Sequence, residues 1–170
     1  MSPAGIEIER KFRLRALPAP EVLAEHGAVP RRLEQVYLAG DPPGRRIRRI
    51  EHADGTTEHR LTRKERLREH AWREDEAAID AARFETLLAE ADPGRRPVRK
   101  TRYVVPHGTQ HLEIDAFESP AGLVLLEVEL EEDDEAIDLP AWVGEWREVT
   151  RDPQYLNVNL ALADTVLADW

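Results

Sequence analysis

The feature that most constrains the fold of this chain is an alternation of apolar and charged residues with a period of two. It recurs in segment after segment, and each charged face carries mainly one sign of charge. The acidic faces are Glu7/Glu9, Glu74/Glu76, Glu113/Asp115 and Glu127/Glu129, and the basic faces are Arg46/Arg48, Thr62/Lys64 and Lys100/Arg102. Because successive side chains point to opposite faces of a β-strand, the pattern predicts at least seven strands. That number is enough to close a barrel.

The first of these segments, residues 5–12, has two interpretations. Glu7, Glu9 and Lys11 share one face and oppose apolar residues on the other. In one interpretation they form the solvated face of a half-buried antiparallel strand. In the other they line a polar interior, where the carboxylates hold a divalent cation and the lysine meets an anion. The segment alone leaves both open.

The remaining strands favour a charged interior. Solvent-facing surfaces usually mix the two signs of charge, whereas each strand here keeps to one sign. Predicted helices cover the residue ranges 19–26 and 81–91, a short stretch near Ala141, and about 153–167. If the apolar strand faces pack outward under these helices, the charged faces line a lumen.

A lumen of this kind suits an anion that is carried with its metal. Crowded carboxylates repel one another unless a cation lies among them. Ligation by oxygen alone indicates Mg²⁺ or Mn²⁺. Several arginines and lysines that converge on one space suit a polyphosphate, whose oxygens accept charge-assisted hydrogen bonds. Phosphoryl transfer requires these same components, together with a carboxylate that orients a water molecule.

Composition excludes several other classes of function. A length of 170 residues predicts a single domain over residues 1–170. The net charge of −10 argues against general binding to nucleic acid or to an anionic membrane. The absence of cysteine excludes disulfides and thiolate chemistry. No apolar run reaches transmembrane length, so a cytoplasmic protein is expected, either monomer or homodimer.

Lysine is rare in this chain, and its placement is informative. Only Lys11, Lys64 and Lys100 occur among the 24 basic residues, and all three fall in predicted strands. An arginine-biased composition could leave three lysines at random positions. Alternatively, each marks a place that needs a compact point charge, which the planar guanidinium of arginine does not supply.

Taken in order, these segments carry a resemblance to a known family. Glu7-Ile8-Glu9-Arg10-Lys11 is similar to the ExExK signature of the CYTH superfamily, the triphosphate tunnel metalloenzymes. The likeness continues through Gln35-Val36-Tyr37-Leu38, Arg46-Ile47-Arg48, Leu61-Thr62-Arg63-Lys64, Glu74-Asp75-Glu76, Lys100-Thr101-Arg102-Tyr103, Leu112-Glu113-Ile114-Asp115, Glu127-Val128-Glu129, and the closing Glu148-Val149-Thr150 with Tyr155 and Asn157.

The resemblance implies an α+β fold, in which eight antiparallel strands form a barrel-shaped tunnel with helices packed outside. It implies hydrolysis of a triphosphate substrate, most simply inorganic tripolyphosphate, with Mg²⁺ or Mn²⁺. On matching positions, the metal ligands would be Glu7, Glu9, Glu127 and Glu129, assisted by Glu113 or Asp115. The phosphate-binding residues would be Lys11, Arg46, Arg48, Lys64, Lys100 and Arg102, and Lys11 would also take part in catalysis. Glu74 or Glu76 would orient the attacking water.

The chain departs from the family pattern at two places. Trp72 stands where relatives often place an arginine, so one phosphate contact is expected either to be missing or to be supplied by Arg73. The tail segment 156–160 offers no lysine, which leaves closure of the tunnel at that end undecided. Outside the motif, Arg31 and Arg32 precede the strand predicted over residues 33–38 and are expected to be solvated loop charges.

Several alternative functions remain open. Thiamine triphosphate or a nucleoside triphosphate could replace tripolyphosphate as the substrate. The same superfamily includes class IV-type adenylate cyclases, which form cyclic AMP from ATP. A non-catalytic binder of polyphosphate or of phosphorylated ligands would use the same cations. The simplest alternative is a structural barrel whose charges face water.

Overall fold

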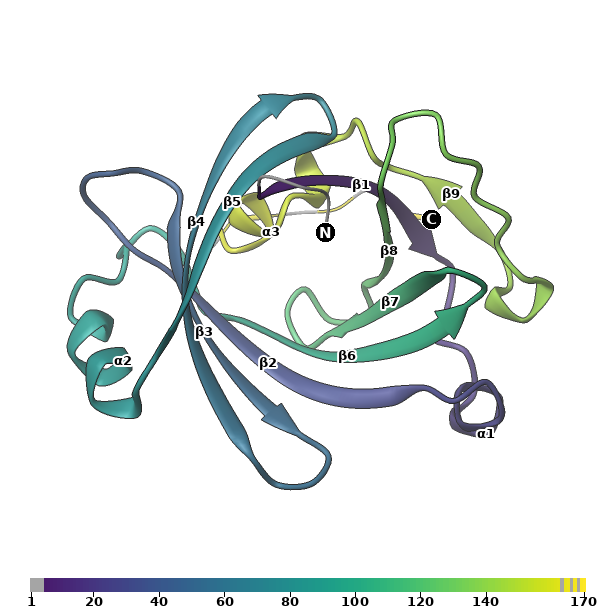
Figure 1. The fold of residues 1–170 in the computed structure, drawn as a ribbon, viewed down its shortest axis with the longest axis horizontal. Coiled ribbons are helices and arrows are strands. Elements are labelled where there is room, and N and C mark those ends of the chain that lie inside the picture. Colours follow the sequence, from purple (N-terminus) through teal and green to yellow (C-terminus); the bar gives the residue numbers. More distant parts are fainter. Residues whose placement is uncertain (1–4, 163, 166, 168) are drawn as a thin grey trace.

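Eight antiparallel strands close into a barrel, as predicted (Figure 1). The computed structural model describes residues 5–162, 164–165, 167 and 169–170. The strands are β1 (Ile6–Leu14), β2 (Val29–Tyr37), β3 (Arg45–His52), β4 (Thr57–Arg68), β5 (Ala71–Ile79), β6 (Val98–His107), β7 (Gln110–Phe117), β8 (Val124–Leu130) and β9 (Trp146–Glu148). Their order is β5-β4-β3-β2-β6-β7-β8-β1, and pairing of β1 with β5 closes the ring. The short strand β9 adds to the remaining edge of β1.

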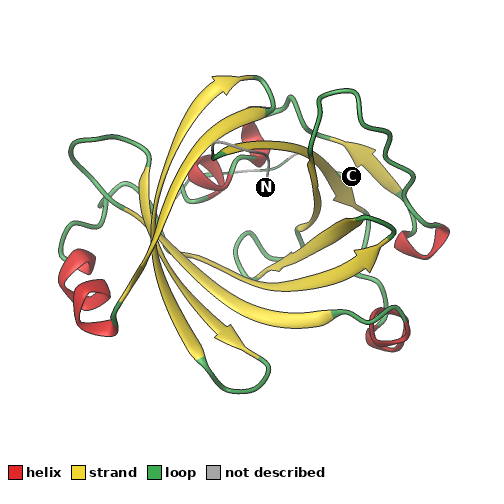
Figure 2. Ribbon diagram, in the orientation of Figure 1, coloured by secondary structure: helices red, strands yellow, loops and turns green. Residues whose placement is uncertain are grey.

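The apolar residues on the outer faces of the strands form clusters that short helices cover (Figure 2). On β1, Ile8, Phe12 and Leu14 are buried in a cluster with residues of β7 and β8. This cluster lies under helix α1 (Pro20–Glu25) and the 3₁₀ helix η1 (Ala141–Val143). Helix α2 (Ala81–Leu88) covers β3 and β4 in the same way. The expected outward packing of the apolar faces is thus confirmed.

The interior of the barrel is charged at one end and apolar at the other. The apolar end consists of inward-facing strand residues and residues of the tail. Its members are Tyr37, Val98, Phe117, Leu123, Leu125, Val149, Tyr155, Leu160 and Ala161. Alternation alone predicts a charged lumen throughout, but the inner faces of β2, β6, β7 and β8 become apolar toward this end. We call this cluster the floor of the barrel.

The tail of the chain closes the barrel at the floor. The helix predicted over residues 153–167 is wrong over its described part, where helical structure is confined to two short pieces; residues 163 and 166 of that range lie outside the described residues. The two pieces are the 3₁₀ turn η2 (Pro153–Tyr155) and helix α3 (Asn157–Leu160), separated by Leu156 in an extended conformation. The break lets the Tyr155 carbonyl oxygen accept a hydrogen bond from Lys11 Nζ at 3.1 Å. In Figure 1, α3 lies behind the opening of the barrel.

Strand β2 begins four residues earlier than predicted, which corrects the interpretation of Arg31. It starts at Val29, so Arg31 is a strand residue that lies opposite His52 of β3 and Arg102 of β6. It therefore shares the inner face of the barrel with Leu33 and is not a loop charge. Separately, no described helix is both long enough and apolar enough to cross a membrane.

Candidate active site inside the barrel

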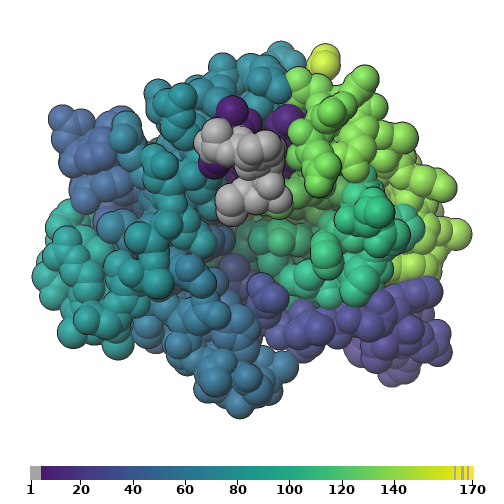
Figure 3. Space-filling model, viewed as in Figure 1, coloured from purple at the N-terminus to yellow at the C-terminus, as the bar shows by residue number. Residues whose placement is uncertain are grey.

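The charged end of the barrel contains a cavity of about 340 Å³. The molecular surface is hollowed on this face, between the β3–β5 and the β6–β8 parts of the barrel (Figure 3). All but three of the predicted site residues line the cavity, and they come from seven strands. They are Glu7, Glu9, Arg46, Arg48, Lys64, Glu74, Glu76, Arg102, Glu113, Glu127 and Glu129. Charges of both signs thus turn inward together.

The carboxylates gather on neighbouring strands β1, β7 and β8. Glu9 lies directly opposite Glu129, and Glu113 lies directly opposite Glu127. Side chains at such paired positions are about 5 Å apart at Cβ. The Glu9 side chain is only 13% exposed. Burial, followed by the charge of Glu127, raises the pKa of Glu9. Ionisation of Glu9 in this site is therefore less favourable than in water.

Glu7 and Glu129 share a proton-dependent contact. Burial raises the pKa of Glu129 to about 7, and a hydrogen bond with Glu7 and the Glu7 charge add to this effect. Burial would also raise the pKa of Glu7, but the Lys64 ammonium and the hydrogen bond with Glu129 lower it to about 2. Below about pH 7, Glu129 is therefore mainly protonated and can donate to ionised Glu7, which removes one negative charge from the site.

The cations occupy a wall formed by β3, β4 and β6, and β6 pairs directly with β7, so Arg102 borders the carboxylates. Lys64 Nζ lies 2.5 Å from Glu7 Oε2 and 3.1 Å from Glu74 Oε2. Arg48 donates to Glu76, which also accepts a hydrogen bond from Thr62 at 2.9 Å. Burial opposes the charge on Lys64, but neighbouring carboxylates outweigh it and raise its pKa. Lys64 is therefore a permanent positive charge in the cavity.

Several polar atoms around the cavity are buried without a hydrogen-bond partner among the described residues. They are Arg31 Nε, Gln35 Oε1, Arg46 Nε, Arg48 Nε, Glu74 Oε2 and Glu127 Oε1. Glu74 Oε2 has an ionic contact with Lys64, but the two groups are not aligned as a hydrogen bond. An unpaired buried polar group costs about 1–3 kcal/mol. Their concentration at one cavity indicates that a ligand completes these bonds.

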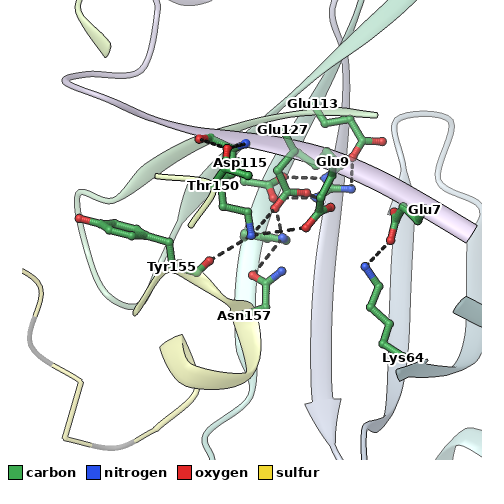
Figure 4. A network of polar contacts seen from close by, with 12 residues as sticks. Glu7, Glu9, Lys64, Glu113, Asp115, Glu127, Thr150, Tyr155 and Asn157 are labelled. Carbon is green, nitrogen blue, oxygen red and sulfur yellow. Dashed lines mark hydrogen bonds and ion pairs between the residues drawn. The ribbon is translucent and has the colours of Figure 1, made fainter. Parts of the chain in front are cut away.

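The three remaining predicted residues lie beneath the cavity and do not line it. Lys100 Nζ and Asp115 Oδ2 are 2.5 Å apart, and both side chains are 0% exposed. Arg102 forms two bonds of 2.7 Å with Asp115. Lys11 Nζ lies 3.2 Å from Glu127 Oε1 and donates to the tail. We call Lys11, Lys100 and Asp115 the sealed layer; Figure 4 labels Asp115 beside Glu127 and Glu113 of the cavity.

The sealed layer controls the charge of Glu127. Burial would raise the pKa of Glu127, but Lys11, Arg102 and Lys100 together hold it well below the usual value. Glu127 is therefore ionised whatever the state of its neighbours in the cavity. All three lysines of the chain lie inside the barrel, one in the cavity and two beneath it.

A divalent cation fits the carboxylates of β1 and β8. The donors are oxygens only, Glu127 Oε1 has an ionic contact with Lys11 but no hydrogen-bond partner, and burial together with the charge of Glu127 raises the pKa of Glu9. Within the described residues, no three acidic or histidine side chains already converge as a metal site. Instead, Lys11 contacts Glu127 and Lys64 contacts Glu7. Cation binding would exchange some of these ammonium contacts for metal contacts.

Six polar or charged cavity residues were missed as site residues by sequence reasoning. They are Arg31, Gln35, His52, Glu58, Arg60 and Asn157. All of them except Asn157 continue the same two-residue alternation as the predicted positions, so the signal was present. Asn157 could not be found in this way, because it reaches the cavity from the tail.

The two departures from the family pattern have structural outcomes. Arg73 pairs with Glu65 at 3.3 Å on the outer surface, and both side chains are about half exposed. It does not line the cavity, so the prediction that Arg73 supplies a phosphate contact is wrong. Trp72 instead packs beside the cations, and its ring centroid lies 6.0 Å from Lys64 Nζ. The tail closes the tunnel without a lysine, through Tyr155 and Asn157.

Comparison with known proteins identifies the family. No protein-family model matches the chain. A curated relative from Nitrosomonas europaea, named inorganic triphosphatase, is 38% identical over 162 residues, which cover 92% of this chain and 97% of that protein. An inorganic triphosphatase from Acetivibrio thermocellus is 41% identical over 64 residues, or 37% of this chain and 40% of that protein.

Solved structures agree with this result. A crystal structure of an inorganic triphosphatase is 35% identical, covers 92% of this chain and 95% of its own, and gives a TM-score of 0.56. A protein from Pyrococcus horikoshii OT3 shares the fold, with 21% identity, coverage of 75% and 80%, and a TM-score of 0.52. The resemblance read from the motifs is thus confirmed. The chain belongs to the inorganic triphosphatase family of the CYTH superfamily, a family of enzymes that hydrolyse phosphoric anhydrides.

Proposed function

We propose that this protein hydrolyses inorganic tripolyphosphate in the barrel cavity, with Mg²⁺ or Mn²⁺ as the cofactor. The observation that carries the proposal is the barrel cavity, in which a wall of cations borders a wall of crowded carboxylates. A triphosphate chelated to a divalent cation presents complementary charge to both walls. The name of the Nitrosomonas europaea relative supports the same substrate class.

Arg46, Arg48, Lys64 and Arg102 bind the phosphate groups in this proposal. Arg46 and Arg48 each have an unpaired buried Nε–H group that a phosphate oxygen can accept. Lys64 and Arg48 contact carboxylates in the ligand-free cavity, and the substrate would replace those contacts. The cations then balance the charge that develops on the leaving diphosphate.

The carboxylates of Glu7, Glu9, Glu127 and Glu129, with Glu113 beside them, would hold the divalent cation. When bound, the cation clamps phosphate oxygens and withdraws their charge. Ionised Glu127 is fixed by the cations beneath it, so it offers an oxygen without first losing a proton. Loss of the proton that Glu129 carries would accompany metal binding.

Glu74 is the better candidate to orient the attacking water. Its Oε2 atom is buried without a hydrogen-bond partner, whereas Glu76 already accepts hydrogen bonds from Arg48 and Thr62. The water would donate to Glu74 while its oxygen attacks the terminal phosphorus atom. A P–O bond then forms to water, and the bond to the bridging oxygen breaks, so diphosphate leaves with the electron pair.

The sealed layer supports this site without entering it. Direct phosphate binding by Lys11 and Lys100, catalysis by Lys11, and metal binding by Asp115 stay predictions from the family pattern. Their burial beneath the cavity favours positioning roles. Asp115 fixes the guanidinium of Arg102, and Lys11 fixes the carboxylate of Glu127.

The cavity favours an inorganic substrate over an organic triphosphate. Its described lining contains no tryptophan, tyrosine or phenylalanine, and its one imidazole, His52, is hydrogen-bonded to Glu58 at 2.8 Å, so it offers a poor stacking platform for a nucleobase or a thiazolium ring. The lining polar groups instead extend the charge toward the opening through Arg31 and Arg60. Thiamine triphosphatase, nucleoside triphosphatase and adenylate cyclase activities are therefore the weaker alternatives.

A substrate panel tests the proposal. Tripolyphosphate, thiamine triphosphate and ATP are each incubated with Mg²⁺, with Mn²⁺ and with EDTA, and the products are resolved by phosphorus NMR. We expect orthophosphate and diphosphate from tripolyphosphate, only with metal, and slower reaction of the organic substrates. Metal-independent release, preference for ATP, or formation of cyclic AMP would contradict the proposal. A rise in melting temperature with tripolyphosphate but no turnover would indicate a binding protein.

A further inference from the structure

Gln35 is a neutral polar residue within the cation wall, and it is almost completely buried. It is 1% exposed, it lies in the second half of β2, and it lines the cavity. The flanking residues on its face are Leu33 toward the opening and Tyr37 in the floor, both also buried. A glutamine at such a position needs a hydrogen-bond partner, because burial without one is costly.

The neighbours of Gln35 do not supply that partner. Gln35 stands directly opposite Arg48 of β3 and opposite Val98 of β6. Its Oε1 atom has no partner among the described residues, and the same holds for Arg48 Nε. Two complementary groups on facing positions thus remain unbonded, while the Arg48 guanidinium is directed to Glu76.

Substrate binding would satisfy both groups at once. A phosphate that draws Arg48 away from Glu76 brings its Nε–H group toward the facing carboxamide. The Gln35 Oε1 atom can then accept from Arg48 Nε, while Gln35 Nε2 donates to a phosphate oxygen. A carboxylate at this position could accept from Arg48 but would repel the phosphate, so the uncharged side chain is the one that serves both purposes.

Given the proposed function, we infer that Gln35 is a further substrate-contacting residue, which donates a hydrogen bond to a phosphate group and aligns Arg48 on it. This role differs from that of the lysines and arginines, because it depends on direction and not on charge. It also explains why a buried, unpaired carboxamide is retained in a β-barrel wall. Removing that carboxamide should therefore weaken substrate recognition without weakening the fold.

Two variants test this inference, with tripolyphosphate and Mg²⁺ as the assay. Gln35→Met keeps the length of the side chain and removes its hydrogen bonds. We expect kcat/KM to fall about 10- to 100-fold, the range for a hydrogen bond to a charged group, mainly through KM. The melting temperature without substrate should stay equal or rise, because an unsatisfied buried group has been removed. Gln35→Glu should lose more activity than Gln35→Met.

Other outcomes separate the possible failures. Gln154→Met, at an exposed position of the tail, is the matched control and should behave as wild type. Unchanged kcat/KM in Gln35→Met, or a fall in its melting temperature that accompanies the loss of activity, would overturn the inference. Retained activity in Gln35→Glu would also overturn it, since Gln35 would then only hold Arg48. An inactive wild type would instead refute the proposed function.

Discussion

The cavity and the sealed layer contain the same residue types but differ in how completely their charged groups are paired. In the sealed layer, Asp115 accepts hydrogen bonds from Lys100 Nζ and from the Nε and Nη2 atoms of Arg102. In the cavity, arginine and glutamate atoms remain unpaired, and Glu9 and Glu129 have raised pKa values. The difference shows that one barrel interior can serve both stability and function. The paired charges of the sealed layer stabilise the barrel, whereas the unpaired polar atoms of the cavity are available to bind a ligand.

The largest effect is expected in the sealed layer. Asp115→Ala leaves the Lys100 ammonium buried without its partner, which costs about 3–5 kcal/mol of the free energy of unfolding. Urea unfolding monitored by tryptophan fluorescence measures this loss. Asp75→Ala, on the exposed outer face of β5, is the control and should change stability little. Equal stability of the two variants would remove the distinction between the layers.

The next effect concerns activity in the cavity. Lys64→Ala removes a permanent positive charge that faces the substrate, so kcat/KM for tripolyphosphate should fall by about 100-fold or more. Steady-state phosphate release measures it. Arg63→Ala, one residue away on the exposed outer face of β4, removes the same charge from the surface and should retain activity. Similar losses in both variants would point to a general effect of net charge.

A smaller effect is expected where the tail seals the barrel. The Lys11 backbone N–H donates to Thr150 Oγ1 at 2.9 Å. Thr150→Val keeps the shape of the side chain but leaves this donor unpaired, at a cost of about 1–3 kcal/mol. Thermal unfolding measures the change, with exposed Thr109→Val as the control. No difference between the two would mean that the tail does not stabilise the closed end.

The smallest effect is a pH dependence measured without metal, in EDTA. The pKa of Glu129 is raised from 4.5 to about 7, so the folded protein binds this proton more tightly than the unfolded chain. Its stabilising contribution is complete below pH 4.5 and is lost as pH rises through about 7. The Glu129→Gln variant should lack this loss, a difference of a few degrees in melting temperature at about 2–4 °C per kcal/mol. Parallel pH curves for variant and wild type would contradict the assignment.

The alternation in the sequence predicted which face each residue occupies, but not its depth in the barrel. Lys11 and Lys64 follow the same pattern, yet Lys64 lines the cavity and Lys11 lies beneath it. A period of two fixes the inner face of a strand, whereas depth depends on strand register and on how far the tail reaches. Depth therefore could not be predicted from the strands alone.

The tail was the least predictable part of the fold. Its apolar residues suggested one long helix, but Leu156 is extended and the helices around it are short. Tertiary contacts determine the conformation here, because Tyr155 and Leu160 pack into the floor and the Tyr155 carbonyl oxygen accepts a hydrogen bond from Lys11 Nζ. Asn157 enters the cavity only as a consequence of this packing.

The central claim is that the crowded carboxylates of the cavity exist for metal-dependent hydrolysis and not for stability. Phosphate release from tripolyphosphate with Mg²⁺, measured for Glu9→Gln beside Glu51→Gln on the exposed outer face of β3, tests it most directly. We predict that Glu9→Gln abolishes release while its metal-free melting temperature stays equal or rises, and that Glu51→Gln matches wild type. Full activity in Glu9→Gln, or a loss of activity explained by unfolding, would contradict the claim.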